Sequence, residues 1–444
     1  MKDLTKGRPS VLILTFALPI FLANLLQLTY SLADTRIVGT FLGDNALAAV
    51  GATTTLSNLI VQFLMGMCNG FAIISAQCFG AKDMDRLRRS LGNSLVLGLL
   101  AAVVLTFGGL VFLQPILRFL NVPENLLNTA TQYVSVIIAG LVITLLYDVL
   151  SATLRAIGDT VTPLIVLAVS VVLNIGGDLL LIVVLHMGVL GAAVATVLSQ
   201  LIAVVVCAVY LWKKYEILRI RVDDMKLQDA GMLRNMLSSG LSMGFMSSLV
   251  NIGTLTLQTS INRLGQNIII AHTAARKISE IFMIMFSVFG QTMATYCGQN
   301  LGAGEITRIK KGVHASSFLA FLTSAFISIV MFLFGKTLLS MFISGDPEQT
   351  SQVLAIAWHY LSIMASCLCI LYFLYVYRSA LQGLGNTMIP MLSGVVEFFV
   401  RVGVALLLPK LIGQNGIFYA EIAAWTGAAV LLMISYYINI RKFA

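Results

Sequence analysis

Charged residues are scarce in this chain. Only 11% of its 444 residues are Asp, Glu, Lys or Arg, whereas a soluble domain carries about 25%. Together with 58% hydrophobic residues and a mean hydropathy of +0.93, this deficit excludes an ordinary soluble protein and predicts a protein of the lipid bilayer. The net charge of +9 is therefore interpreted as a feature of membrane topology, and no nucleic-acid partner is expected.

Metal-ligand and catalytic motifs are also lacking. The six cysteines form no CxxC pair and the four histidines share no metal-ligand spacing, so we expect no disulfide framework, metal site or cofactor. No HExxH, GxSxG or paired-aspartate signature occurs, which argues against an enzyme. A cleaved signal peptide is disfavoured because the first apolar run is too long and contains Asn24, Gln27 and Asp34.

Long apolar runs dominate the sequence instead. Most are about 20 residues or longer, which is enough to cross roughly 30 Å of hydrocarbon. The runs do not alternate with a period of two, so they indicate helices. We expect an all-α integral membrane protein with twelve transmembrane helices. The predicted spans are 11–37, 46–77, 90–113, 129–155, 160–186, 188–212, 236–262, 268–297, 312–334, 352–380, 387–408 and 415–440.

The basic residues follow this topology. An even number of spans leaves both termini on one side, and most of the 28 Lys and Arg residues fall in loops of that side. The positive-inside rule then places both termini in the cytoplasm. This topology assigns Arg155 and Arg378 to the inner side and Arg276 to the outer side, and it leaves Arg401 within a span.

The chain repeats itself at about half its length. Residues 77–82 (QCFGAK) correspond to 299–304 (QNLGAG) at an offset of 222, and 154–163 correspond to 381–390 at an offset of 227. Each half holds six spans, so the repeats are parallel, and we expect two pseudo-symmetric six-helix lobes with a central cleft that opens to alternate sides. The predicted division is an N-lobe (1–212), a cytoplasmic linker (213–235) and a C-lobe (236–444).

The first span carries a polar stripe. Asn24, Gln27, Ser31 and Asp34 follow one another at spacings of three and four residues and share one helix face. An acid in such a helix is costly unless it faces protein or water. Pro19, on the same span, permits either a static bend or a hinge.

Acids within spans are the strongest functional signal, because a charge at mid-bilayer costs about 2.5–3.5 kcal/mol. Asp178 lies one helical turn after Asn174, and Thr196 and Tyr133 could complete a polar chamber with Asp34. Such a chamber could exchange a proton or ligate sodium through Asp34, Asp178 and Asn174. It could also be a hydrogen-bond network that pins helices together. The acids within spans are Asp34, Asp148, Asp178, Glu280, Glu397 and Glu421.

The other intramembrane acids have nearby arginines in the sequence. Glu397 and Arg401 stand at i,i+4 and predict an ion pair with a structural or gating role. Glu280 follows Arg276 at the same spacing, which favours a structural role. Asp148 stands seven residues before an arginine and either pairs with it or joins the chamber.

Four motifs, taken in order, resemble those of the multidrug and toxic compound extrusion (MATE) family. Members of that family are twelve-helix exporters of two six-helix lobes, driven by proton or sodium antiport. The resemblance covers nearly the whole chain. The motifs are Asp34 with Gly39, Gly43 and Ala46–Gly51, then Asn174–Asp178, Gln299–Gly304 and Leu381–Thr387.

The resemblance implies that Asp34 is the coupling acid of the first span and that Pro19 is the proline at which this span bends. Asp148 stands near a position where some members have Asn. Spans 236–262 and 352–380 contain no Asp or Glu, which favours the DinF-like branch, coupled in the N-lobe, over the NorM-like branch. The implied N-lobe chamber residues are Gln27, Tyr133, Asn174, Asp178 and Thr196.

These observations predict a monomeric multidrug exporter of a bacterial-type cell membrane. It would exchange lipophilic, cationic small molecules for protons, or for sodium, by alternating access. The first alternative is a flippase for lipid-linked oligosaccharides, which would need a large cationic cavity; Arg401 is the one cation that sequence analysis places within a span. The second alternative, an intramembrane enzyme, explains the two-lobe repeat poorly.

Overall fold

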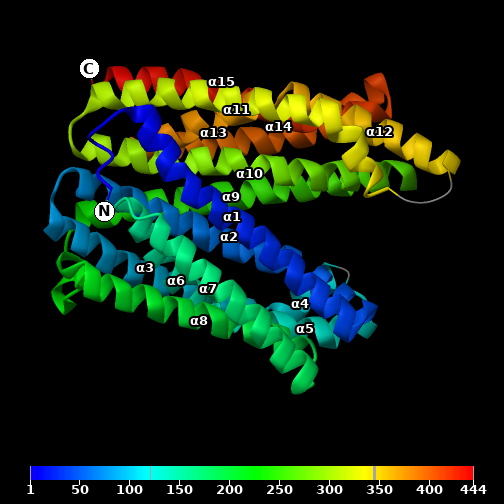
Figure 1. Cartoon of the computed structure of the whole chain (residues 1–444), viewed down its shortest axis with the longest axis horizontal. Coiled ribbons are helices and arrows are strands. Elements are labelled where there is room, and N and C mark those ends of the chain that lie inside the picture. Colours follow the sequence, from blue (N-terminus) through cyan, green and yellow to red (C-terminus); the bar gives the residue numbers. More distant parts are fainter. Residues whose placement is uncertain (1, 121, 344–346, 444) are drawn as a thin grey trace. The chain divides into compact units, whose positions relative to one another are not determined.

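The computed structural model describes residues 2–120, 122–343 and 347–443. Throughout these ranges the regular structure is helical, without a strand (Figure 1). The helices of the first half are α1 (Pro9–Leu42), α2 (Asp44–Gly80), α3 (Met84–Val111), α4 (Leu113–Phe119), α5 (Glu124–Ala139), α6 (Leu141–Ala156), α7 (Val161–Asp178), the π-helix η1 (Leu179–Val184) and α8 (Val189–Lys214).

Two short 3-10 helices, η2 (Glu216–Leu218) and η3 (Val222–Met225), precede the second half. The helices of the second half are α9 (Ala230–Ile261), α10 (Gln266–Gly302), α11 (Ile306–Ser340), α12 (Pro347–Ser366), α13 (Leu368–Gly383), α14 (Met388–Ile412), the 3-10 helix η4 (Gln414–Tyr419) and α15 (Ala420–Arg441).

The spans agree with the prediction of twelve. Among the described residues, ten helices are individually long and apolar enough to cross a membrane. The pairs α5–α6 and α12–α13 also qualify when each bent pair counts as one span, with bends of 44° and 45°. The bends fall at Gly140 and Cys367, which are 227 residues apart, so the repeat includes its two broken helices. The predicted all-α integral membrane fold is confirmed.

Backbone geometry repeats with the sequence. Gly43 and Gly265 precede α2 and α10 with φ of 81° and 103°, and Gly158 and Gly385 have φ of 86° and 79°. Glycine adopts this left-handed region without the steric cost that a side chain adds. The matched motifs therefore produce the same turns in both halves of the chain.

The chain forms two compact units. Unit 1 comprises Leu18–Gly244 with the extreme N-terminus, and unit 2 comprises Leu4–Ala17 and Phe245–Ala444. The boundaries therefore fall inside α1 and α9 and not within the predicted linker. The first turns of α1 belong to unit 2, and the first turns of α9 belong to unit 1.

Hydrogen bonds hold the segment before α1 in unit 2. The Leu4 N–H donates to Gln299 Oε1 at 3.0 Å, and Asn300 Nδ2 donates to the Leu4 carbonyl at 3.3 Å. Arg308 Nη2 donates to the Gly7 carbonyl at 3.0 Å. One of the repeated motifs, QNLGAG, thus fixes the start of the helix that carries Asp34.

Close helix packing holds the start of α9 in unit 1. A Cβ atom on Gly70 of α2 would lie 2.5 Å from the Ser239 carbonyl oxygen, and one on Gly240 would lie 2.5 Å from Phe71 Cε1. Small residues at such crossings let helix backbones approach closely.

The predicted linker is folded into unit 1. The buried Asp224 carboxylate accepts hydrogen bonds from Arg88 Nε at 2.7 Å and from the Arg221 N–H at 2.8 Å. Gly92 of α3 lies against the same segment, since a Cβ there would be 2.5 Å from the Asp224 carbonyl oxygen. The segment is therefore an integral part of the unit that contains Asp34.

The Asp159 side chain bonds to the first turn of α7, the helix that carries Asn174 and Asp178. Its Oδ1 accepts from the Thr162 N–H at 3.0 Å, and its Oδ2 accepts from the Tyr215 hydroxyl at 2.8 Å. Burial alone raises the pKa of Asp159, but the hydrogen bonds from Thr162 and Tyr215 outweigh that effect and hold the pKa below its usual range.

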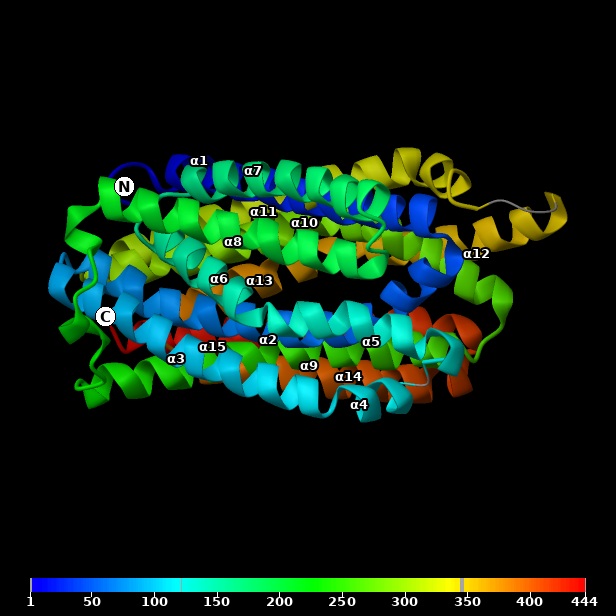
Figure 2. The same cartoon turned by 90° about the horizontal axis from the view of Figure 1, so that it is seen from below.

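Helix pairs within each unit position the polar side chains. In unit 1, α7 and α8 run side by side in both views (Figures 1 and 2). In unit 2, α10 packs against α13, and α14 against α15. The apolar core of unit 1 is built largely from α2, α3, α5, α6 and α8.

Candidate functional site

Two carboxyl groups meet in unit 1. Asp34 of α1 and Asp178 of α7 lie close enough for each carboxyl group to act on the other. Asp178 is fully buried and Asp34 half-buried. In each, the Oδ1 atom is buried without a hydrogen-bond partner among the described residues. Because an ionised carboxylate has no donor, a hydrogen bond between these two groups requires a proton on one of them.

Asn174 connects this acid pair to α8. In the amide orientation that satisfies both of its groups, Asn174 Nδ2 donates to Asp178 Oδ2 at 3.2 Å and its oxygen accepts from the Thr196 N–H at 3.2 Å. The spacing of four residues aligns Asn174 with Asp178. The helix widens into the π-helix η1 directly after Asp178, a distortion often found at functional sites.

Two tyrosines complete the chamber. The Tyr30 hydroxyl lies 3.2 Å from Thr196 Oγ1. Tyr133 of α5 lies within electrostatic range of Asp34, Asp178 and Tyr30. Tyr30 was not predicted as a site residue, although it lies one helical turn before Asp34 in the sequence. The structure therefore gathers residues from α1, α5, α7 and α8 around the acid pair.

Three of the site residues predicted for the N-lobe lie apart from this cluster. Gln27, two turns before Asp34, is exposed. Pro19 lies within α1, which continues through it as one helix, two residues after the boundary between the units at Ala17. Asp148 of α6 is the third, and its surroundings are described in the next paragraph.

The charged neighbour of Asp148 is Arg155, seven residues later on α6. Arg155 Nη2 donates to Asn69 Oδ1 at 3.4 Å. In the part of the chain that the structure describes, Asp148 Oδ2 is buried and has no hydrogen-bond partner. The structure thus does not bring Asp148 to the acid pair.

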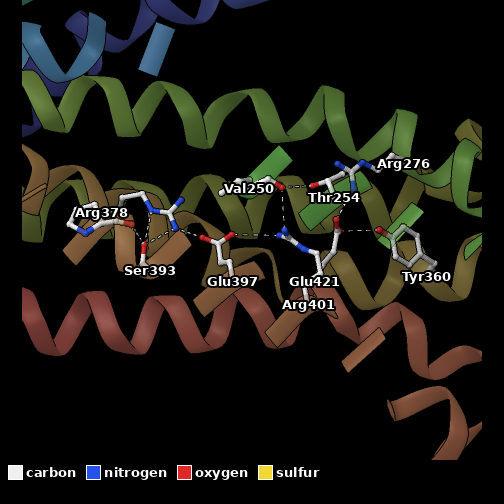
Figure 3. Close-up of polar contacts among 10 residues, drawn as sticks. Val250, Thr254, Arg276, Tyr360, Arg378, Ser393, Glu397, Arg401 and Glu421 are labelled. Atoms are coloured by element: carbon white, nitrogen blue, oxygen red, sulfur yellow. Dashed lines mark hydrogen bonds and ion pairs between the residues drawn. The ribbon is translucent and has the colours of Figure 1, made fainter. Parts of the chain in front are cut away.

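Unit 2 contains a row of buried charges (Figure 3). Arg378 donates to Ser393 Oγ at 3.0 Å and pairs with Glu397 Oε1. Glu397 Oε2 lies 3.5 Å from Arg401 Nη2. Arg401 Nη1 also reaches the Val250 carbonyl at 3.5 Å. The predicted pair of Glu397 and Arg401 is present, with Arg378 as a second partner that sequence analysis had assigned to the inner side.

A second ion pair in unit 2 joins α10 to α15. Arg276 Nη1 lies 2.6 Å from Glu421 Oε1, and the Tyr360 hydroxyl donates to Glu421 Oε2 at 3.1 Å (Figure 3). Glu280, which is exposed, lies 3.3 Å from Arg276. The partner of Glu421 could not be predicted from the sequence because its arginine lies 145 residues away.

The intramembrane acids of the two units therefore differ in their partners. Glu280, Glu397 and Glu421 of unit 2 each face an arginine within 4.0 Å. The three acids of unit 1 keep buried oxygens without hydrogen-bond partners among the described residues. In the same residues, no group of three or more His, Cys, Asp or Glu could hold a metal ion. Unit 1 is thus the part suited to exchanging a proton or a cation.

Comparison with known families identifies the chain. The model of the MatE family matches residues 19–180 and 242–407, most of its length. This protein belongs to the MATE family. It is therefore a membrane transporter and not an enzyme, as the sequence predicted.

Similar MATE relatives include two proteins of Bacillus subtilis (strain 168). The probable multidrug resistance protein YoeA is 29% identical over 349 residues, which cover 76% of this chain and 75% of YoeA. The probable multidrug resistance protein YpnP is 26% identical over 419 residues, which cover 94% and 92% of the two chains.

Solved MATE structures share the fold. One, of an outward-facing multidrug resistance MATE transporter of the MOP superfamily, matches with a TM-score of 0.90 at 22% identity and covers 100% of this chain and 99% of that one. Another, of MATE in the bent conformation, matches with a TM-score of 0.91 at 22% identity and covers 99% and 97%.

An apolar groove of about 740 Å³ runs along unit 1 of this MATE transporter. It is lined by residues of α1 and α7. These two helices also carry the acid pair, but neither Asp34 nor Asp178 lines the groove. The residues that line it are Leu22, Leu25, Leu26 and Thr29 of α1 and Leu164, Ile165, Ala168, Val169, Val172 and Leu173 of α7.

Proposed function

We propose that this MATE transporter exports lipophilic, cationic small molecules, drugs among them, in exchange for protons by alternating access. The observation that carries the proposal is the proximity of Asp34 and Asp178, two carboxyl groups whose buried Oδ1 atoms have no hydrogen-bond partner among the described residues. The names of YoeA and YpnP support a multidrug substrate range.

Coupling follows from competition for the acid pair. When both carboxyls are ionised, they repel each other and attract a cationic substrate. A proton on the pair removes charge, allows the hydrogen bond, and weakens the hold on the substrate. An ion can drive export only if its binding changes the affinity for substrate, and a shared acid pair meets that condition.

The donor set around the pair supports a proton over sodium. Hard cations are bound by several oxygen ligands at once. In the described part of the chain, no group of three or more His, Cys, Asp or Glu could hold a metal ion. A proton needs only one carboxyl oxygen.

The surroundings of the pair support the proposed substrate class. Two carboxyl groups attract a cation, and the apolar groove formed by α1 and α7, the helices that carry them, suits a lipophilic molecule. We further propose the DinF-like arrangement, with coupling in the N-lobe, in a monomer of a bacterial cell membrane whose termini are both cytoplasmic.

The runner-up function, oligosaccharide-lipid flipping, receives less support. A flippase for anionic lipid-linked sugars would need unpaired cations in a cavity. Unit 2 does contain more buried arginines than the sequence suggested, but Arg276, Arg378 and Arg401 each contact a glutamate. These ion pairs largely neutralise the arginines within the protein.

Ethidium transport by proteoliposomes tests the proposal. With the interior acidified and no sodium gradient, we expect ethidium to accumulate, and a sodium gradient alone should drive none. Asp34→Asn and Asp178→Asn should abolish accumulation while leaving the elution profile of the protein unchanged. The matched control is Glu280→Gln, which should transport normally because Glu280 is exposed and already paired with Arg276.

Two results would contradict the proposal. Transport at the normal rate by Asp34→Asn under a pH gradient would remove the acid pair from the mechanism. Accumulation driven by sodium alone would show that the coupling ion is sodium.

A further inference from the structure

Asp148 is the one intramembrane acid of unit 1 that the proposed mechanism does not use. It shares with Asp34 and Asp178 a feature that the unit 2 glutamates lack. Its Oδ2 atom is buried without a hydrogen-bond partner among the described residues. A buried carboxylate oxygen in that condition is costly, and the cost disappears when the group binds a proton or a cation.

Arg155 does not neutralise Asp148 by contact. Seven residues of α-helix rise by about 10.5 Å. Among the described residues the two side chains form no ion pair within 4.0 Å, and Arg155 instead donates to Asn69 on α2. The neighbouring arginine therefore attracts Asp148 from a distance and leaves its oxygen unoccupied.

The neighbours of Asp148 suit a proton better than a metal cation. The titratable and charged groups around it and its arginine are Arg155 and Tyr147 of α6, Cys68 of α2 and Cys207 of α8. A guanidinium repels a metal cation, and a thiol and a phenol are poor ligands for sodium, which prefers several carbonyl and carboxylate oxygens. A proton needs only the one free oxygen.

Asp148 is also separate from the acid pair. Asp34 and Asp178 act on each other, whereas Asp148 interacts with Arg155. Asp148 can therefore bind a proton whether or not the pair carries one.

We propose that Asp148 is a second proton-binding group of unit 1, so that each cycle moves two protons, one on the pair of Asp34 and Asp178 and one on Asp148. This inference rests on the proposed proton-coupled export. Two protons exchanged for one monovalent cation move one net positive charge per cycle. Transport is then electrogenic and responds to membrane potential as well as to pH.

The stoichiometry can be measured in proteoliposomes that accumulate ethidium, a monovalent cation. With the interior one pH unit more acidic and the potential clamped at zero by valinomycin and equal potassium, each proton exchanged contributes about a factor of ten to the final concentration ratio. Wild type should reach about 100-fold accumulation, and Asp148→Asn about tenfold. An imposed potential should change accumulation by wild type and leave that by Asp148→Asn unchanged.

Matched variants separate this inference from the proposed function. Glu280→Gln, whose acid faces Arg276 and Lys277, should keep the wild-type ratio and potential dependence. Asp34→Asn should lose accumulation altogether. Failure of wild type to respond to pH would overturn proton-coupled export itself.

A concentration ratio that corresponds to one proton per cycle would refute the role of Asp148 and leave proton-coupled export standing. A wild-type ratio near tenfold, or transport that ignores the potential, refutes two-proton coupling even if Asp148→Asn fails to fold. A wild-type ratio in a folded Asp148→Asn variant refutes it as well.

Discussion

Removing the charge of Glu397 should lower the stability of the protein strongly, because this buried carboxylate pairs with two buried arginines. Its Oε1 pairs with Arg378 and its Oε2 lies 3.5 Å from Arg401, and all three residues are 2–3% exposed. Glu397→Gln keeps the shape of the side chain and removes its charge. Breaking a buried ion pair from one side costs about 3–5 kcal/mol, because a charge stays buried without its partner.

The matched control is Glu280→Gln. Glu280 lies 3.3 Å from Arg276, but its side chain is 48% exposed, and exposed pairs contribute about 0–1 kcal/mol. For a unit of 150–250 residues, 1 kcal/mol shifts the melting temperature by about 2–4 °C. We therefore expect Glu397→Gln to lower it by about 6–20 °C and Glu280→Gln by less than about 4 °C.

Thermal unfolding of the purified protein in detergent, followed by intrinsic tryptophan fluorescence, measures this difference. Adding Arg378→Met to Glu397→Gln should restore part of the lost stability, because it removes one of the two orphaned charges. Melting of Glu397→Gln within about 2 °C of wild type would refute the reasoning, since it would mean that water or another group already compensates the arginines.

Three further predictions concern single contacts. Asp159→Asn should lower the melting temperature at pH 7, and the difference from wild type should disappear below about pH 4. The pKa of Asp159 is lower in the folded than in the unfolded protein, so its ionised form stabilises the fold above the unfolded pKa. This stabilisation is lost as the pH falls through the folded pKa. Gly312→Ala should destabilise by about 1–3 kcal/mol in the same melting assay, because its Cβ would overlap the Tyr296 ring, whereas Gly108→Ala, with open space around it, should not. Tyr30→Phe should slow ethidium accumulation by about 2–10-fold, since it removes one hydrogen bond, and an unchanged rate would exclude Tyr30 from the chamber.

The twelve spans and the repeat could be predicted from sequence because both are signals along the chain. Hydropathy over about 20 residues measures what the bilayer requires of a helix. The Asn174 and Asp178 spacing also worked, because residues four apart share a helix face. The bends at Gly140 and Cys367 could not be found this way, since apolar residues continue on both sides of each.

The partners of the unit 2 arginines could not be predicted from the sequence. A charged residue near the end of an apolar run is counted as loop, because hydropathy cannot detect its partner. Arg378 pairs with a glutamate 19 residues later and Arg276 with one 145 residues later, so each pair joins two helices. Likewise, Arg155, the charged neighbour of Asp148, bonds to Asn69 of another helix.

The division of α1 and α9 between the units has a consequence for how the protein can be cut. A chain cleaved between η3 and α9 would leave the first fragment without Ala230–Gly244 and the second without Leu4–Ala17. We expect each fragment to be unstable alone and the two to recover function only when produced together. Equivalent helices that exchange their first turns have the topology of a domain-swapped dimer, here joined into a single chain.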